Sequence, residues 1–249
     1  MKEYFLFRLY GPMSAWGDIA VGEFRPSYAH PSKSAVIGLL AAALGLRRDE
    51  EGVHQAMASS YGFAVRVDAA GSPIRDYHTA QVPPAGSGRR KNTFATRKDE
   101  LAVPKEELGT ILSSRDYRCD SLYTVCLWII GDSSPYLLAE LEAALVKPAF
   151  TLYLGRKSCP LALPLQAQVV EASNLREAFH SARFEDMNFL KSLTSSQTVD
   201  VYWEGVEADG YTAVHTIERR DSPLSRRRWQ FAVRSEHYAA ESASREQEE

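Results

Sequence analysis

Four consecutive residues, Gly155-Arg156-Lys157-Ser158, combine the side chains with which proteins hold a phosphate group. Glycine lets the backbone come close to a ligand, arginine offers a planar fork of donors, and lysine offers a point charge. The apolar run 150–154 precedes them and predicts a strand that leads into the loop. Such a pattern is common after strands, and the GxxxxGK[ST] spacing of a P-loop is absent from the sequence. The loop is therefore a candidate anion site whose ligand the pattern does not identify.

A second candidate anion site is the start of a helix predicted over residues 31–46. Ser32 and Ser34 are both suitable N-caps, and Gly45 suits a left-handed exit at the other end. A helix N-terminus carries partial positive charge and unpaired amide donors, so Ser34 and the cation Lys33 could hold an anion such as a phosphate. Apolar residues surround the whole helix, however, and spacing alone favours a buried core helix with an ordinary serine cap.

Three further residues could do chemistry, but each has an ordinary structural explanation. Trp16, in a predicted loop, is either a platform for base stacking or a lid on the core, and the lid is favoured. Tyr77 and His78 lie on a predicted strand and could in principle do acid–base chemistry, although a single histidine on a strand more often only makes a hydrogen bond. No GxSxG, HExxH or paired-carboxylate pattern occurs, so we predict no catalytic set, no metal site and no cofactor.

Residues 82–115 are a long stretch without clear periodicity. Segments of this length inside a compact domain are usually functional protrusions or disordered. Phe94 lies among its basic residues, and this mixture suits an arm that follows a nucleic-acid backbone. The sequence leaves such an arm and a solvated flexible loop equally open. The basic residues of this stretch are Arg89, Arg90, Lys91, Arg97 and Lys98. A second basic cluster, which predicts a solvated turn or a contact with a partner or RNA, consists of Arg219, Arg220, Arg226, Arg227 and Arg228.

The composition is that of a globular protein with unevenly distributed charge. The chain has 249 residues, of which 45% are hydrophobic and 24% charged, which suits one large or two small domains. Because the formal net charge is −3, a site for a polyanion must be a local patch. The three cysteines have no CxxC spacing, which argues for a reducing compartment and against structural zinc. No run resembles a signal peptide or a membrane span, so we expect a cytoplasmic protein without membrane contact.

The order of the predicted elements indicates an α+β fold that positions these candidates. Residues 1–165 follow a βαββαβ pattern typical of a ferredoxin-like (RRM-like) domain, in which two helices cover one face of an antiparallel sheet and the other face stays open for a ligand. We expect residues 166–240 to form a smaller β-rich part and residues 241–249 a disordered acidic tail. The predicted strands are 4–10, 63–67 and 74–81 (a hairpin), 117–130, 150–154, 199–203, 211–217 and 228–233, and the main helices are 31–46 and 134–147.

Four runs of sequence resemble the CasD family, the Cas-five type subunit of type I-E CRISPR Cascade complexes. They occur in the family's order and together are quite specific, and the resemblance covers residues 1–165 best. The runs are Leu9 to Gly17, Pro31 to Leu40 with Leu44 to Asp49, Arg75 to Thr79, and Tyr153 to Pro160.

This resemblance implies a RAMP-type, ferredoxin-like protein with a glycine-rich loop. It implies a non-catalytic subunit that binds the 5′ handle of the crRNA and presses on it with a protruding thumb, here residues 82–115, next to the first backbone subunit. The implied partners are the crRNA, the backbone and large subunits, and target DNA through the assembled complex.

The resemblance also implies roles for individual residues. As phosphate clamps we expect Arg25, Lys33 and Ser34, together with the loop residues Gly155, Arg156, Lys157 and Ser158. As stacking surfaces we expect Trp16 and Tyr153. As residues that grip the strand from the thumb and its base we expect Arg89, Arg90, Lys91, Arg97, Lys98 and Arg115.

Two alternatives remain open. Relatives in type I-C systems are metal-independent ribonucleases that cut precursor crRNA, and His78, Tyr77 and Lys33 could be imagined in that role, although in type I-E systems the cut is assigned to another subunit. The second alternative is a ferredoxin-like interaction or small-molecule module that binds no RNA.

Overall fold

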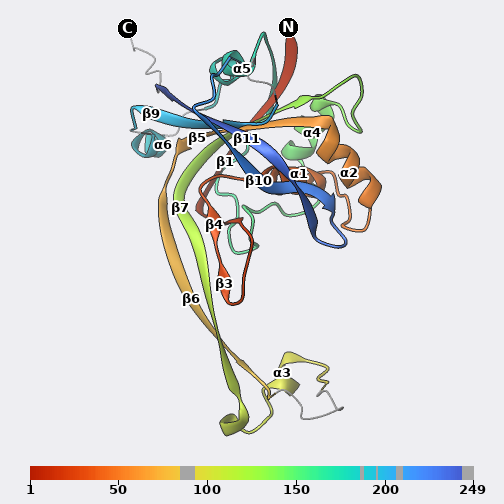
Figure 1. Ribbon diagram of the computed structural model, residues 1–249, viewed down its shortest axis with the longest axis vertical. Helices are drawn as coiled ribbons and strands as arrows, with labels where there is room; N and C mark the ends of the chain where they lie inside the picture. Colours follow the sequence, from red (N-terminus) through yellow and green to blue (C-terminus); the bar gives the residue numbers. More distant parts are fainter. Residues whose placement is uncertain (85–92, 186–187, 195, 206–209, 243–249) are drawn as a thin grey trace.

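The computed structural model describes residues 1–84, 93–185, 188–194, 196–205 and 210–242. It consists of a large, mainly antiparallel sheet with helices packed against it and a two-stranded arm that projects from one end (Figure 1). The helices are α1 (Lys33–Ala43), α2 (Glu51–Ser60), α3 (Arg97–Glu100), α4 (Leu138–Val146), α5 (Leu175–Ser181) and α6 (Asn188–Leu193), with a 3-10 turn at Lys105–Glu107. The strands are β1 (Lys2–Ser14), β2 (Trp16–Gly17), β3 (Phe24–Arg25), β4 (Ser27–Tyr28), β5 (Tyr61–Ala69), β6 (Ser72–Val82), β7 (Gly109–Ile129), β8 (Gln168–Ala172), β9 (Thr198–Trp203), β10 (His215–Ser225) and β11 (Gln230–Ser242).

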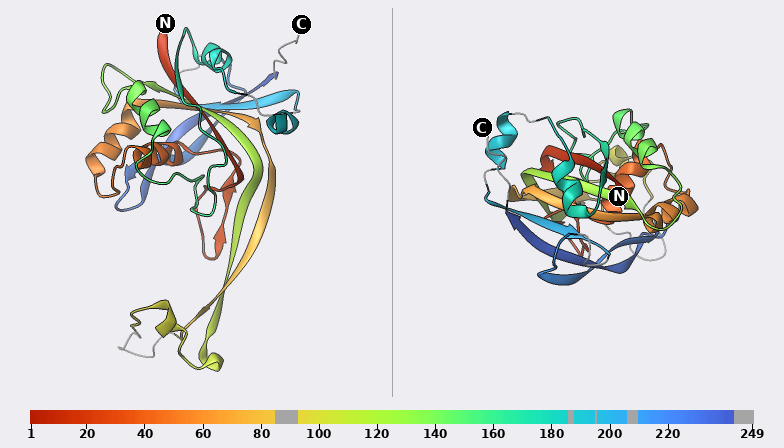
Figure 2. Two further views of the ribbon diagram at one scale, coloured as in Figure 1. Left: turned by 180° about the vertical axis from the view of Figure 1, so that it is seen from behind. Right: turned by 90° about the horizontal axis from the view of Figure 1, so that it is seen from above.

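One sheet runs through the whole described chain. Seven of its strands follow the order β10-β11-β9-β5-β7-β1-β8, and β1 pairs antiparallel with both β7 and β8. The C-terminal strands extend this sheet beyond β5, where Val65 lies opposite Tyr202 of β9 (Figure 2). The predicted boundary at residue 165 is therefore wrong, because β8 and β9 complete the same sheet as the N-terminal strands.

The arm exists because β7, at 21 residues, is longer than either strand that pairs with it on that side. β5 pairs with its second half and β6 with its first half, both antiparallel, so the predicted hairpin between residues 63–67 and 74–81 is wrong. Gly71 (φ +64°) and Asp120 (φ +53°) lie where β5 gives way to β6. A Cβ at Gly71 would lie 2.2 Å from the carbonyl oxygen of Cys119, so glycine is required there.

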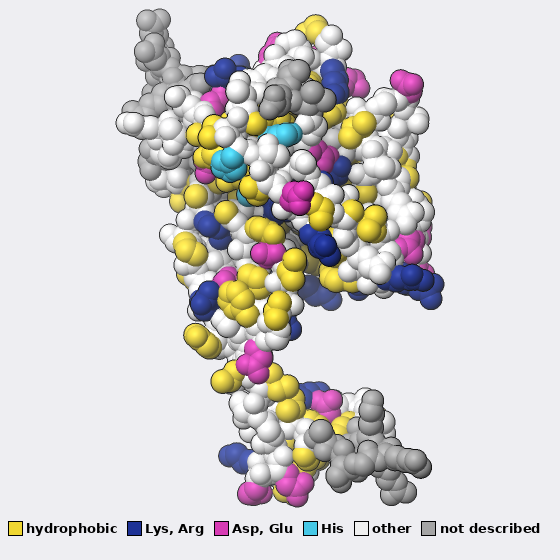
Figure 3. Space-filling model, viewed as in Figure 1, with side chains coloured by type: hydrophobic (Ala, Val, Ile, Leu, Met, Phe, Trp, Pro, Cys, Tyr) yellow, Lys and Arg dark blue, Asp and Glu magenta, His cyan; other side chains and the backbone are white. Residues whose placement is uncertain are grey.

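We define the arm as β6, residues 109–119 of β7, and the tip between these strands. It extends clear of the body and carries α3 at its far end (Figures 1 and 3). The stretch predicted to be aperiodic over 82–115 overlaps both strands of the arm, because Val82 belongs to β6 and residues 109–115 belong to β7. Residues 85–92, which include Arg89, Arg90 and Lys91, lie outside the described part of the chain.

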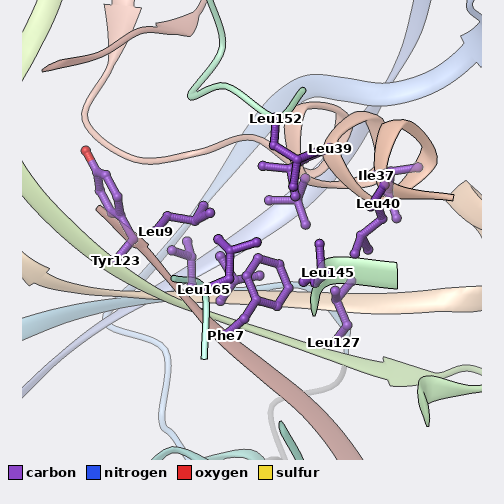
Figure 4. Packing of buried hydrophobic residues seen from close by; sticks show 14 of the residues in the cluster. Phe7, Leu9, Ile37, Leu39, Leu40, Tyr123, Leu127, Leu145, Leu152 and Leu165 are labelled. Carbon is purple, nitrogen blue, oxygen red and sulfur yellow. The ribbon is translucent and has the colours of Figure 1, made fainter. Parts of the chain in front are cut away.

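The main core lies between one face of the sheet and helices α1, α2 and α4. Ile37 and Leu40 of α1 are completely buried near Phe7 and Leu127 of the sheet (Figure 4). Two expectations for α1 are confirmed: the Ser32 side chain accepts a hydrogen bond from the Ala35 amide, and Gly45 has a φ of +80°. Helix α1 is thus the buried core helix that the apolar residues around its whole circumference favoured.

The predicted strand at residues 150–154 is not formed. The amides of Ala149 and Phe150 donate to carbonyl oxygens at the end of α1, at 2.8 and 3.2 Å, while Leu152 and Leu154 are buried in the main core. Packing against α1 therefore holds this segment, and β8 takes the place beside β1.

The opposite face of the sheet is covered, contrary to the prediction that it stays open. Leu175 and Phe179 of α5 pack there with Leu6 of β1 and with Trp203 of β9. Side chains on both faces of the central strands are buried, so the sheet centre cannot receive a ligand.

The acidic tail begins later than predicted. Glu241 and Ser242 belong to β11, and the Glu241 carboxylate accepts hydrogen bonds from Tyr211 Oη and Arg176 Nε, each at 2.8 Å. Residues 243–249 lie outside the described part of the chain. Among the described helices, we find none with the length and apolar character needed to span a membrane.

Candidate nucleic-acid interface

The loop Gly155–Ser158 is anchored on the end of β1. The Leu154 carbonyl accepts a hydrogen bond from the Ala15 amide (3.0 Å), and the Leu154 amide donates to Cys159 (2.8 Å). Gly155 has a φ of +84°, and a Cβ there would lie 1.9 Å from the Ala15 carbonyl oxygen. Both the conformation and the space therefore require glycine. The anchored turn leaves the side chains of Lys157 and Ser158 exposed.

Arg156 connects this loop to the base of the arm. Its Nη1 donates to the carbonyl of Asp116 (3.1 Å) and its Nη2 to the carbonyl of Arg25 (3.2 Å). The guanidinium lies 4.6 Å from the centroid of the Tyr117 ring, a cation–π contact. Arg156 is thus both a structural brace and a half-buried charge.

Arg25 and Arg115 lie beside that brace. They are register partners in the parallel pairing of β3 with β7, and Arg25 Nη1 also donates to the Gly22 carbonyl (2.6 Å). The nearest acid along β7, Asp116, is held in a two-pronged pair by Arg75, at 2.7 and 3.2 Å. We call Arg25, Arg115, Arg156 and Lys157 the arm-base patch.

The arm-base patch is cationic, and Asp76 of β6 is the register partner of Arg115. No carboxylate among the described residues forms an ion pair with any of its four members. Figure 3 shows Lys and Arg side chains along the lower edge of the body, on the side from which the arm projects. Partly exposed cations without an ion-pair partner in the described chain suit the binding of a phosphate backbone.

Lys33 does not belong to this surface, so its predicted role as an accessible phosphate clamp is wrong. Its ammonium forms an ion pair with Glu204, and its side chain is only 6% exposed. Its amide donates to Asp221 Oδ2 at 2.9 Å. The start of α1 therefore does bind an anion, but that anion is a carboxylate of β10.

Trp16 is also buried, at 1% exposure, and packs edge to face on Tyr123 with a centroid separation of 5.6 Å. It is the core lid that the sequence favoured, and the stacking role is wrong. Tyr153, by contrast, is 39% exposed and remains a candidate stacking surface. Ser34 is half-buried; its Oγ lies 3.0 Å from Ser32 Oγ, and its carbonyl accepts a hydrogen bond from Arg226.

An open cleft of about 980 Å³ lies beside the loop. Tyr153 and Gly155 form part of its wall, and Ser34 and Gly38 of α1 form another part. The rest of the wall comes from the segment after Trp16 and from the β10–β11 hairpin. Three predicted site residues, Ser34, Tyr153 and Gly155, thus meet in one cleft.

The described cations of the arm tip are distant from the cleft along the arm. Arg97 and Lys98 are exposed on α3, and Arg97 pairs with Glu100 and donates to the Gln81 carbonyl. They could contact only a ligand or neighbour that reaches the far end of the arm.

The imagined acid–base set of Lys33, Tyr77 and His78 is not assembled. Tyr77 and His78 are exposed on β6, where they lie opposite Ser114 and Ser113, whereas Lys33 is buried against Glu204.

The sequence pattern placed Arg220 and Arg226 only in a basic cluster expected to be a solvated turn or a contact with a partner or RNA, and it did not single out Arg48 or Trp229. Arg220, Arg226 and Trp229 line the cleft, and Arg48 packs on Trp229. The available signal was a tryptophan next to the run Arg226–Arg228, the mixture of aromatic and basic residues that was noticed only at residues 89–98.

Comparisons with known proteins show which family this chain resembles in sequence and fold. The family model described as CRISPR-associated protein (Cas_Cas5) matches residues 4–236. The chain is 37% identical over 186 residues to the CRISPR system Cascade subunit CasD of Escherichia coli K12, covering 72% of this chain and 76% of that protein. It superposes on a chain of a CRISPR RNA-guided surveillance complex with a TM-score of 0.64 at 25% identity, covering 96% of this chain and 90% of the other. A second match, a crystal structure of a Cas protein, has a TM-score of 0.56 at 25% identity and covers 96% and 94% of the two chains.

Proposed function

The chain belongs to the CRISPR-associated Cas5 family, and we propose that it is the non-catalytic subunit that binds and caps the 5′ handle of the crRNA in a type I-E Cascade surveillance complex. The observation that carries the proposal is the arm-base patch. Four cations from three separate parts of the chain meet there, around an anchored glycine loop that opens into the cleft.

The path of the backbone supports the same proposal. Strands β8, β1, β7 and β5 are neighbours in that order, with α1 between β1 and β5 and α4 between β7 and β8. We interpret this unit as the ferredoxin-like βαββαβ core and the arm as its thumb. In the assembled complex the thumb would contact the adjacent backbone subunit, and target DNA would meet this chain only through the complex.

A single-stranded handle suits the chemistry of the patch. Phosphate contacts fix the position of such a strand, and aromatic side chains can stack on its unpaired bases. Arg25, Arg115 and Lys157 would contact the phosphates, and Tyr153 would stack on a base.

A salt titration of RNA binding tests the proposal. The full chain is titrated into a labelled 5′-handle RNA from its own CRISPR repeat, with anisotropy measured at several salt concentrations. Lys157→Gln removes an exposed charge that has no ion pair within the described part of the chain, so it should weaken binding and lower the salt slope by about one. The matched control is Lys191→Gln, an exposed lysine on α6.

Equal binding by Lys157→Gln and the control, with equal slopes, would contradict the proposal. The same reactions in EDTA test catalysis. Site-specific cleavage of the full repeat RNA that is lost in His78→Ala would overturn the non-catalytic assignment in favour of a ribonuclease.

A further inference from the structure

The turn between β10 and β11 is fixed firmly against the helices. Arg48 Nε donates to the carbonyl of Arg226 (3.2 Å), and Gln55 Nε2 donates to the carbonyl of Leu224 (2.8 Å). In the other direction, Arg226 Nη2 donates to the Ser34 carbonyl of α1 at 2.5 Å. Three long-range hydrogen bonds therefore hold the turn in one position over the cleft.

The fixed turn concentrates positive charge that the described chain does not neutralise. Arg226 is half-buried over Gly38, where an added Cβ would lie 3.1 Å from its guanidinium. Its Nε is buried without a hydrogen-bond partner, and no described carboxylate forms an ion pair with Arg226 or Arg48. Burial lowers the pKa of Arg226, and the charge of Arg48 lowers it further. Two close guanidiniums without an ion-pair partner in the described chain are a place where an anion would be stabilised.

Trp229, next to these guanidiniums, is the exposed tryptophan of the chain. It is 59% exposed, whereas Trp16, Trp128 and Trp203 are at most 5% exposed. Arg48 lies 4.5 Å from its ring centroid, and Phe231 packs against it edge to face at 5.6 Å. Its φ of +58° is unfavourable for a tryptophan, so nothing in the backbone conformation of this position calls for a large side chain.

Arg226 and Trp229 line the same cleft as Tyr153 and Gly155. We propose that the β10–β11 turn and Arg48 form a nucleotide site, in which Arg226 and Arg48 bind a phosphate and an unpaired base stacks on Trp229. Arginine next to an exposed aromatic ring is the combination that holds single-stranded nucleic acid. The identification of the ligand as RNA rests on the proposed function, and the site extends the RNA track from the loop 155–158 across the cleft to the hairpin.

Tryptophan emission tests this inference directly, because the other three tryptophans are buried. The 5′-handle RNA should quench the emission saturably, whereas inorganic phosphate should not, since it has no base to stack. Trp229→Phe keeps a stacking ring and serves as the control, so it should retain binding and lose the RNA-dependent change in emission. Trp229→Gly removes the ring while suiting the positive φ, and should weaken RNA binding about tenfold, in the range for the loss of one base stack. Arg226→Met should weaken binding similarly while the protein stays folded, checked by circular dichroism.

The outcomes separate this inference from the function on which it rests. If RNA binds with an affinity that depends on Lys157 but leaves the Trp229 emission unchanged, the nucleotide site is wrong and the proposed function stands. If a neighbouring Cascade subunit without RNA changes that emission and RNA does not, the turn is a protein interface and the site is wrong. If the chain binds no RNA by anisotropy, both proposals are wrong.

Discussion

Gly155 is the residue on which the candidate site depends most locally. Gly155→Ala would place a Cβ 1.9 Å from the Ala15 carbonyl oxygen, at a φ of +84°. Because the clashing atom belongs to the backbone, relieving the clash requires the main chain itself to move. We expect the free energy of unfolding to fall by about 2 kcal/mol or more, measured by urea denaturation.

The matched control for that substitution is Gly52→Ala, in α2. A Cβ there meets no atom within 4 Å, and alanine is favoured over glycine in a helix by about 1 kcal/mol, so this variant should be slightly more stable. Equal stability of Gly155→Ala and the wild type would show that the loop can move without cost, contrary to its anchored geometry.

At this scale the sequence predicts conformation better than exposure. The Ser32 cap and the left-handed Gly45 follow from local backbone chemistry, and both are confirmed. Lys33 was misjudged because its partner, Glu204, is 171 residues away in the chain. No local pattern reveals that a carboxylate from a distant strand neutralises a lysine at a helix start.

Among the elements, the tip of the arm is the one that should be dispensable for folding. Neither α3 nor the 3-10 turn buries a residue, and Val82 and Gly109 are register partners. Replacing residues 83–108 with an Asn-Gly turn should therefore leave the unfolding free energy within about 0.5 kcal/mol of the wild type. If the tip contacts the backbone subunit, native mass spectrometry should show incomplete complexes.

Complete complexes from the shortened chain would contradict that role for the tip. Arg97→Gln with Lys98→Gln is the companion variant, since it keeps the shape of the tip and removes two exposed charges. Loss of folded protein on shortening would instead show that the tip stabilises the body.

The sequence identified most strands but not their partners. β5 and β6 were recognised as strands, yet a turn signal between two strands predicts a hairpin, and the length of β7 decided otherwise. Residues 150–154 have the apolar composition of a strand but are drawn to the end of α1. Such outcomes depend on competition between distant partners, which a local pattern does not contain.

Across the whole molecule, a buried charge network joins the C-terminal hairpin to the start of α1. Asp221 of β10 accepts from the Lys33 amide and pairs with Arg234 of β11 at 2.6 Å. Arg234 and Arg219 both pair with Glu236, which is completely buried. The network explains why Arg219 lies in the interior rather than in the solvated turn predicted from its neighbours.

The network should make the fold sensitive to acid. Burial alone would raise the pKa of Glu236, but the hydrogen bond from His30 and the charges of Arg219 and Arg234 outweigh it and lower the pKa to about 2. The stabilisation is therefore present above pH 4.5, the ordinary value of the carboxyl pKa, and about 3 kcal/mol should be lost as the pH falls from 4.5 to 2.

The neutral imidazole of His30 adds a second, earlier loss. Burial lowers the pKa of His30 below its ordinary value of 6.5, so its contribution is present above pH 6.5 and declines as the pH falls below it. Urea denaturation of the wild type and of His30→Gln between pH 8 and 5 isolates this contribution. A wild-type curve that matches the variant in shape would show that the imidazole is not buried in its neutral form.

Glu236→Gln isolates the first contribution. It should destabilise the protein near pH 7 by about 3 kcal/mol, because it leaves buried guanidiniums without their acid, and it should flatten the curve below pH 4.5. Equal acid sensitivity of wild type and variant would contradict the network as described.

The predicted boundary near residue 165 was wrong because strands that are distant in the sequence pair in one sheet. The change of texture near residue 165 suggested a second part, but β9 completes the sheet beside β5 and α5 covers its far face. Only part of the candidate site could be predicted from the sequence. The loop 155–158 was recognisable as a motif, whereas Arg226 and Trp229 come near it only when the C-terminal hairpin packs over α1.

Crosslinking along the crRNA tests the central claim most directly. Single 4-thiouridines are placed at successive positions of the 5′ handle, the complex is assembled with the full chain and irradiated, and the crosslinked peptides are identified by mass spectrometry. The account predicts crosslinks from handle positions to the loop 153–158 and to the strand residues 114–118 at the base of the arm. Crosslinks confined to other surfaces of this chain, with both segments unmodified at every handle position, would contradict it.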